Sequence, residues 1–231
     1  YRAWRSGELQ IDLVKKPRAS TPSRLAAWHQ APVTLTLIVL SICGFALDYL
    51  PFPPGWLSEL TFTPYTIRGN HIEFYSQGGE FWRFITPAFL HFGWLHIVFN
   101  CLWLWDLGVR VERVMGSFNM LLLFLVIALV SNTVQFVFGG PGIFGGMSGV
   151  VYGLVGYTWF VHAFMPRSQL LINNKMFVVF VIALIVMEIL ASSWIASAAH
   201  AGGLLAGLAM AVLVVILYRF VLARDSIGRL R

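Results

Sequence analysis

Six apolar segments, each long enough to cross or nearly cross a lipid bilayer, dominate this 231-residue sequence. The chain is 58% hydrophobic and 11% charged, whereas soluble domains have about 45–50% apolar and about 25% charged residues. We therefore expect an all-α polytopic membrane domain over residues 33–221, with basic tails at residues 1–32 and 222–231. The six helices are expected at about 33–50, 93–109, 117–138, 147–165, 176–194 and 198–221.

The basic residues indicate how these segments are oriented. In a six-span arrangement, all of the 16 Lys and Arg residues except Arg68 and Arg83 fall on one side of the membrane. Because cytoplasmic loops carry an excess of Lys and Arg, both termini are predicted in the cytoplasm and segment 51–92 on the outer side. Five or seven spans would break this segregation. The net charge of +6 is thus a topology signal, and we expect no nucleic-acid partner.

The remaining extramembrane segments and the cysteines are less distinctive. Segment 51–92 is rich in proline and aromatic residues and is expected to be a structured first loop on the outer side. Residues 1–32 lack the apolar core of a signal peptide, and this basic tail is expected to continue upstream of Tyr1. Cys43 and Cys101 lie in apolar segments without metal-ligand spacing, so we expect neither a disulfide nor a metal site, and no cofactor.

Polar residues gather where alternate segments enter the membrane from the outer side. His96 and Asn100 lie in the first turns of the second segment, Ser148 opens the fourth, and His200 lies in the first turn of the sixth. All four are therefore predicted at a similar shallow depth, with Tyr152 on the same helix face as Ser148. Ionisable and polar groups within a membrane usually face the bundle interior or a water-filled cavity.

The types of these side chains indicate nucleophilic catalysis. Serine is a weak nucleophile until a base takes its proton, and histidine is the usual base. An asparagine amide, a histidine ring and a backbone N–H at a helix N-terminus can stabilise a tetrahedral oxyanion. A glycine-rich loop precedes Ser148 and is expected to turn tightly into the protein from outside.

Each residue alone also has a purely structural interpretation. Gly-x-Ser-Gly around Ser148 and Gly203-x-x-x-Gly207 are common packing motifs between membrane helices. His200 and Asn100 alone would each be interpreted as a hydrogen-bonding group between helices, and Tyr152 alone as a core residue. The coincidence of these polar groups at one depth on alternate segments favours a functional site.

No carboxylate is placed to complete a catalytic triad. Asp106 is six residues past Asn100, which turns it away from that helix face. Asp48 lies at the end of a segment, and Glu188 lies within the fifth segment, where it is expected to face a partner or water near a gate. The sequence therefore predicts a Ser148–His200 dyad.

Taken together, the motifs resemble those of the rhomboid family of intramembrane serine proteases, and most closely its six-helix bacterial members. The resemblance covers about residues 80–210 and includes Trp82-Arg83 in the first loop and Glu112-x-x-x-Gly116 after the second segment. The main motifs are His96-x-x-x-Asn100, Gly146-x-Ser148-Gly149-x-x-Tyr152 and Ala199-His200-x-x-Gly203-x-x-x-Gly207.

The resemblance implies a role for each of these residues. Ser148 would be the nucleophile, His200 the general base, and Tyr152 the ring that orients His200; His96, Asn100 and the Ser148 backbone N–H would form the oxyanion hole. The motif glycines would support the site: Gly146, Gly149, Gly203 and Gly207.

The resemblance also implies how substrates reach the site. The fifth segment and the loop at residues 193–198 would gate it and admit a substrate helix from the lipid. Substrates would be single-pass membrane proteins, cut near the outer end of a helix that unwinds easily. The implied location is the bacterial inner membrane, with the active site open to the outer side.

Two other classes of function stay open. One is a catalytically silent rhomboid-like protein that binds membrane clients, although such proteins typically lose the serine or the histidine. The other is a small transporter, in which His96, Asn100, His200 and Glu188 would line a path, although no inverted repeat is visible. A soluble-type hydrolase is excluded because Ser148 lacks the Gly-x-Ser-x-Gly turn after a strand.

Overall fold

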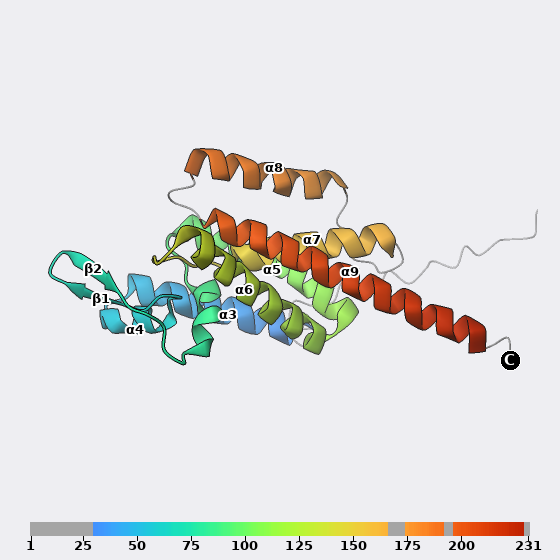
Figure 1. Cartoon of the computed structure of the whole chain (residues 1–231), viewed down its shortest axis with the longest axis horizontal. Helices are drawn as coiled ribbons and strands as arrows, with labels where there is room; N and C mark the ends of the chain where they lie inside the picture. Colours follow the sequence, from blue (N-terminus) through green and yellow to red (C-terminus); the bar gives the residue numbers. More distant parts are fainter. Residues whose placement is uncertain (1–29, 166–173, 192–195, 229–231) are drawn as a thin grey trace, which may run out of the picture.

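The computed structural model describes residues 30–165, 174–191 and 196–228, and they are predominantly helical (Figure 1). A long helix occurs at each of the six apolar segments. Their bounds are α3 Pro32–Tyr49, α5 Trp94–Met115, α6 Ser117–Gly139, α7 Ser148–Phe164, α8 Asn174–Ala191 and α9 Ser197–Gly228. By length and composition, three helices of the described residues can cross a membrane: Pro32–Tyr49, Ser117–Gly139 and Ser197–Phe220. The six-span topology accordingly stays a prediction.

Two helices extend further than the sequence analysis predicts. Helix α5 continues past residue 109 to Met115, so Arg110 and Arg113 lie in its last turns rather than in a turn that follows it. Arg110 pairs with Asp106 one helical turn earlier, and cations are favoured near a helix C-terminus. Helix α9 continues through Gly228, so most of the C-terminal tail predicted at 222–231 is helical.

Segment 51–92 folds into short elements between α3 and α5. It contains the helix α4, an antiparallel hairpin of β1 and β2, and two 3-10 helices, η1 and η2. Their bounds are α4 Pro54–Leu60, β1 Tyr65–Arg68, β2 His71–Phe74, η1 Phe81–Phe84 and η2 Thr86–Phe89. The hairpin turns at Gly69, whose φ of +61° suits a tight turn. This small sheet was not predicted from the sequence.

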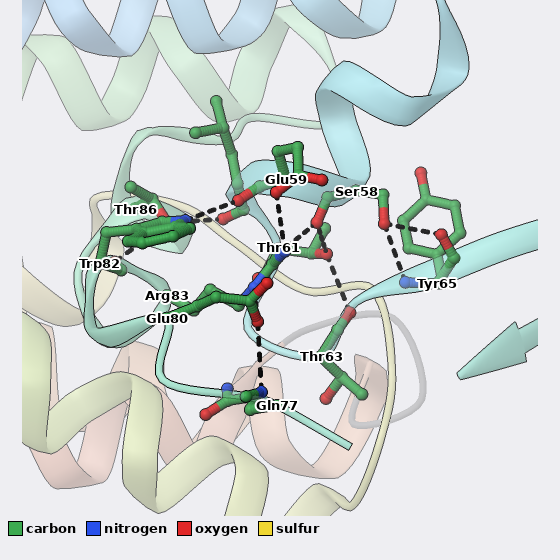
Figure 2. A network of polar contacts seen from close by, with 12 residues as sticks. Ser58, Glu59, Thr61, Thr63, Tyr65, Gln77, Glu80, Trp82, Arg83 and Thr86 are labelled. Atoms are coloured by element: carbon green, nitrogen blue, oxygen red, sulfur yellow. Dashed lines mark hydrogen bonds and ion pairs between the residues drawn. The ribbon is translucent and has the colours of Figure 1, made fainter. Parts of the chain in front are cut away.

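The buried guanidinium of Arg83 holds these elements together (Figure 2). It donates hydrogen bonds to the carbonyl oxygens of Ser58 and Thr61, and it pairs with Glu59 at 2.9 Å and Glu80 at 3.1 Å. A buried charge is tolerated only when it is paired and hydrogen-bonded. Arg83 therefore fixes η1 against the end of α4.

A second buried charge, the carboxylate of Glu112, joins three helices. Its oxygens accept the backbone N–H groups of Val33 and Thr34 at 2.9 and 2.8 Å, and the hydroxyls of Thr34 and Ser117, both at 2.7 Å. The first N–H groups of a helix have no intrahelical acceptor, and a negative charge there is favourable. Glu112, near the end of α5, thus caps the start of α3 and binds the first residue of α6.

Helices α7 and α9 make the most extensive contact of the described part of the chain, and glycines allow it (Figure 1). A Cβ atom at Gly203 would overlap the carbonyl oxygen of Gly149, and one at Gly207 would overlap that of Gly153. The two backbones are therefore in direct contact, as is common where small residues face one another in membrane proteins. Ser148 directly precedes this contact on α7.

We expect Gly207→Ala to destabilise the protein by about 1–3 kcal/mol, because the added methyl group forces the two helices apart. Thermal unfolding in detergent measures this effect. Gly55→Ala is the matched control, since a Cβ at Gly55 would meet no atom within 4 Å. Equal unfolding temperatures for Gly207→Ala and wild type would contradict this account of the α7–α9 contact.

Candidate active site

A cavity of about 840 Å³ lies between helices α5, α6, α7, α8 and the start of α9. The five side chains predicted to form the site all line this cavity, although they come from three different helices. They are His96 and Asn100 from α5, Ser148 and Tyr152 from α7, and His200 from α9.

Ser148 and His200 meet at the first turns of α7 and α9. The distance between Ser148 Oγ and His200 Nε2 is 2.7 Å, which is a hydrogen bond of ordinary length. The hydroxyl belongs to the first residue of α7, so the positive end of the helix dipole lies beside it. This is the arrangement in which histidine can take the hydroxyl proton.

The ring of His200 is held by packing rather than by a second hydrogen bond. Tyr152 stacks on it with a centroid distance of 4.8 Å and an interplanar angle of 27°. Its Nδ1 atom is buried and has no hydrogen-bond partner among the residues that the structure describes. Asp106 is paired with Arg110, and the side chain of Glu188 lies outside the described part.

The groups predicted to bind an oxyanion lie beside Ser148. A Cβ atom at Gly146 would lie 2.6 Å from His96 Nε2 and 3.6 Å from Ser148 Oγ, so only glycine fits between these side chains. Gly146 also has a φ of +127°, which side-chain-bearing residues rarely adopt. Asn100 Nδ2 donates one hydrogen bond to the carbonyl oxygen of His96 at 2.8 Å, which orients its amide at the cavity wall.

The loop before Ser148 is held by a residue that the sequence analysis missed. His91, between η2 and α5, is fully buried, and its Nε2 accepts the backbone N–H of Met147 at 3.3 Å. Its Nδ1 lies 3.0 Å from the carbonyl oxygen of Phe89, to which it donates. Gly146 N also donates to the carbonyl oxygen of Pro87 at 2.9 Å. The segment around η2 therefore fixes the backbone that leads to the serine.

Burial lowers the pKa of His91 to about 4, and the nearby His96 adds to the shift. The folded protein therefore binds fewer protons at this site than the unfolded chain between about pH 6.5 and 4. We expect the contribution of His91 to the free energy of unfolding, about 3 kcal/mol, to be present in full above this window and to be lost as the pH drops through it. The free energy of unfolding, measured as a function of pH, tests this. In His91→Gln we expect it to change less between pH 6.5 and 4 than in wild type. A variant with the wild-type dependence would contradict it.

Helix α6 forms two hydrogen bonds to the backbone of the residue before His200. Ser131 Oγ donates to the carbonyl oxygen of Ala199 at 2.9 Å, and Gln135 Oε1 accepts the Ala199 N–H at 3.0 Å. Ser131 and Gln135 are four residues apart and therefore share one face of α6. Two polar residues at helical spacing in an apolar segment indicate a contact within the protein. Only the fold shows that their partner is the backbone of Ala199.

Helix α8 closes one side of the cavity and is loosely attached (Figure 1). Phe180 is the only buried residue among the α8 side chains that the structure describes. Its ring contacts Trp103 of α5 at a centroid distance of 4.8 Å and Tyr152 of α7 at 5.7 Å. Half of the loop predicted to cap the site at residues 193–198, namely 193–195, lies outside the described residues.

Comparisons with known proteins show which family this chain is similar to. A family model described as the Rhomboid domain matches residues 78–217, which include every site residue named above. The chain is 37% identical over 182 residues to a rhomboid protease GlpG of Pectobacterium atrosepticum, covering 78% of this chain and 62% of that relative. It is 36% identical over 211 residues to a rhomboid protease GlpG of Yersinia pestis, covering 90% of this chain and 71% of that relative.

In the described part of the chain, no group of three or more His, Cys, Asp or Glu side chains could hold a metal ion.

Proposed function

Since this chain belongs to the rhomboid family, we propose that it is an intramembrane serine protease with a Ser148–His200 dyad. The observation that carries the proposal is the 2.7 Å contact between Ser148 Oγ and His200 Nε2 inside a cavity among apolar helices. The curated relatives bear the name of a protease, and the dyad gives this chain the groups that such an activity needs.

The proposed reaction begins with acylation of Ser148. Its Oγ attacks the scissile carbonyl carbon while His200 Nε2 takes the hydroxyl proton. The negative oxygen of the tetrahedral intermediate is stabilised by His96, by the Asn100 amide and by the Ser148 backbone N–H, which lacks an intrahelical acceptor. The intermediate then collapses, and His200 gives its proton to the leaving amine. Water releases the acyl group by the same steps, with His200 again as base.

Tyr152 is proposed to keep the His200 ring in the productive orientation. In a catalytic triad a carboxylate binds the second imidazole nitrogen. Here the stacked ring of Tyr152 restricts the imidazole instead, and Ser131 and Gln135 hold the preceding backbone. These contacts explain how a dyad can stay aligned without a third polar member.

The proposed substrates are single-pass membrane proteins that enter past α8. The ring of Phe180 contacts those of Trp103 and Tyr152 at the cavity wall, and the remaining described surface of α8 is mostly exposed. A helix has its backbone carbonyls paired, so it must unwind before Ser148 can attack one. Helices with glycine or small residues near their outer end are therefore the expected substrates.

The proposed topology follows from the charges and from the position of the site. The membrane domain covers residues 33–221 and lies in a bacterial inner membrane. Both basic tails face the cytoplasm, which places the first turns of α7 and α9, and hence the cavity, toward the outer side.

Cleavage in liposomes tests this proposal. Purified protein is reconstituted with a fluorescent single-pass substrate whose helix contains glycine near the outer end, and the products are mapped by mass spectrometry. We expect one cut within the outer turns of that helix and none with Ser148→Ala. Binding of the substrate by folded wild type without any cut would instead favour a client-binding protein.

A further inference from the structure

We infer that an acyl chain of a membrane phospholipid binds in an apolar hollow between the first loop (residues 51–92) and helix α6. The hollow has a volume of about 400 Å³ and shares no lining residue with the candidate active site. Its lining consists of six apolar side chains, three at η1 and three on α6: Phe81, Phe84, Ile85, Leu125, Val126 and Leu129. The inference goes beyond the proposed proteolysis and does not depend on it.

The contact between η1 and α6 is packed on one side of a hydrogen bond and hollow on the other. Asn132 Nδ2 donates this bond to the carbonyl oxygen of Phe84 at 2.8 Å. Toward the end of α6, the ring of Phe62 fills the contact, with centroid distances of 4.9 Å to Phe136 and 5.3 Å to Phe84. Toward the start of α6, the hollow begins at Leu129. The described residues therefore leave this part of the contact unfilled.

Helix α6 presents the hollow at the depth of the acyl chains. The helix Ser117–Gly139 is long and apolar enough to cross a membrane. Leu125 and Leu129 are exposed in its middle, about 12–18 Å along the axis from its first residue. The hydrocarbon core of a bilayer is about 30 Å thick, so these positions lie well inside it. The surface around the hollow thus meets lipid chains rather than headgroups.

The lining determines which occupant fits. A buried water needs two to four polar partners, and six apolar side chains provide none. An empty space forfeits the dispersion contacts of its walls. A substrate helix about 10 Å wide would exceed the volume of the hollow within two turns. An acyl chain is thin and flexible, and it needs no hydrogen-bond partner.

The position of the hollow also separates it from the proposed route of substrates. Helix α8, past which substrates are proposed to enter, lies on the opposite side of the bundle from α4 of the first loop (Figure 1). Arg83 joins η1 to the end of α4, so η1 belongs to the side of α4. A lipid is therefore the occupant that this face meets.

A chain in the hollow would complete the packing of the first loop on α6. The next element of this loop, η2, supports the candidate active site, because the carbonyl oxygen of Pro87 accepts the N–H of Gly146 at 2.9 Å. We therefore expect the bound phospholipid to stabilise the folded protein.

The test measures thermal unfolding of delipidated protein in detergent during a titration with phospholipid. We expect phospholipid to raise the unfolding temperature of wild type by about 5 °C, because a ligand that binds only the folded state stabilises it. Phe81→Ala removes one wall, about 50 Å² of contact, and should raise the midpoint of the titration about 3- to 10-fold. Phe118→Ala is the matched control, since Phe118 is 76% and Phe81 77% exposed but only Phe81 lines the hollow.

A second pair of variants keeps the test decisive if Phe81→Ala does not fold. Val126→Trp fills the hollow with an indole ring, and we expect it to abolish the rise in unfolding temperature. Leu122→Trp places the same ring at an exposed position of α6 outside the lining and should retain the rise.

Photocrosslinking identifies the occupant in native membranes. With p-benzoylphenylalanine in place of Phe81, we expect irradiation to increase the mass of the intact chain by that of one phospholipid. An adduct with a second copy of the chain or with a co-expressed single-pass substrate, or no adduct, would overturn the inference. So would an equal response of wild type, Phe81→Ala and Val126→Trp to phospholipid. Cleavage and fluorophosphonate labelling of wild type test the protease function separately.

Discussion

Replacing Ser148 or His200 with alanine is expected to lower kcat/KM by about 10⁴- to 10⁶-fold. The two side chains form one unit joined by a 2.7 Å hydrogen bond, and the hydroxyl is not an effective nucleophile without its base. Because they act together, the double variant is expected to lose no more activity than either single variant. Steady-state kinetics on a single-pass substrate measure all three.

The control for these variants is Thr133→Ala, which removes an exposed hydroxyl of α6 that bonds only to its own helix. It is expected to retain wild-type activity. Near wild-type cleavage by folded His200→Ala would exclude histidine as the base. Losses that add up in the double variant would show that the two residues act separately.

The second largest effect is expected for Asn100→Ala, which should lower kcat by about 10²- to 10³-fold. Its amide lies at the cavity wall beside His96 and supplies one of the proposed oxyanion donors. The loss is smaller than that of a dyad residue because His96 and the Ser148 N–H remain. Kinetics with the substrate used for the dyad variants give the comparison.

Asn119→Ala is the matched control for this substitution. Asn119 makes the same type of bond to the carbonyl of the residue four positions earlier, but it is exposed and distant from the cavity lining. Asn119→Ala should therefore leave kcat unchanged. A loss in folded Asn100→Ala as complete as that of Ser148→Ala would assign Asn100 a role other than oxyanion binding.

The sequence was sufficient to locate the helices and to predict which side chains form the candidate site. Apolar segments of bilayer length have few alternatives to helix, because backbone polar groups cannot stay unpaired in lipid. The shared depth of Ser148 and His200 followed from charge segregation and segment order, and the structure places the two side chains in contact. Their catalytic roles stay proposals.

Two features of the fold needed the three-dimensional structure. The sequence predicts a turn at Arg110, because a basic residue in an apolar chain resembles a segment end, but Arg110 lies within α5 and pairs there with Asp106. The strands β1 and β2 are short, so an alternation of apolar and polar side chains along them is too brief to predict a strand. Its turn at Gly69-Asn70 was the available signal.

The supporting residues of the site were missed for a different reason. His91, Ser131 and Gln135 act through backbone atoms of Met147 and Ala199, which are distant from them in sequence. Side-chain patterns along one helix carry no information on which backbone groups of another segment lie opposite. A nucleophile and a base can be predicted from chemistry, whereas the contacts that align them depend on packing.

The most direct test of the central claim is the mass of the intact protein after exposure to a fluorophosphonate, measured beside cleavage of a single-pass substrate. The account predicts one adduct per wild-type chain, located on Ser148, and the loss of both adduct and cleavage in Ser148→Ala. A folded wild type that forms no adduct, or a Ser148→Ala variant that still cleaves, would contradict it.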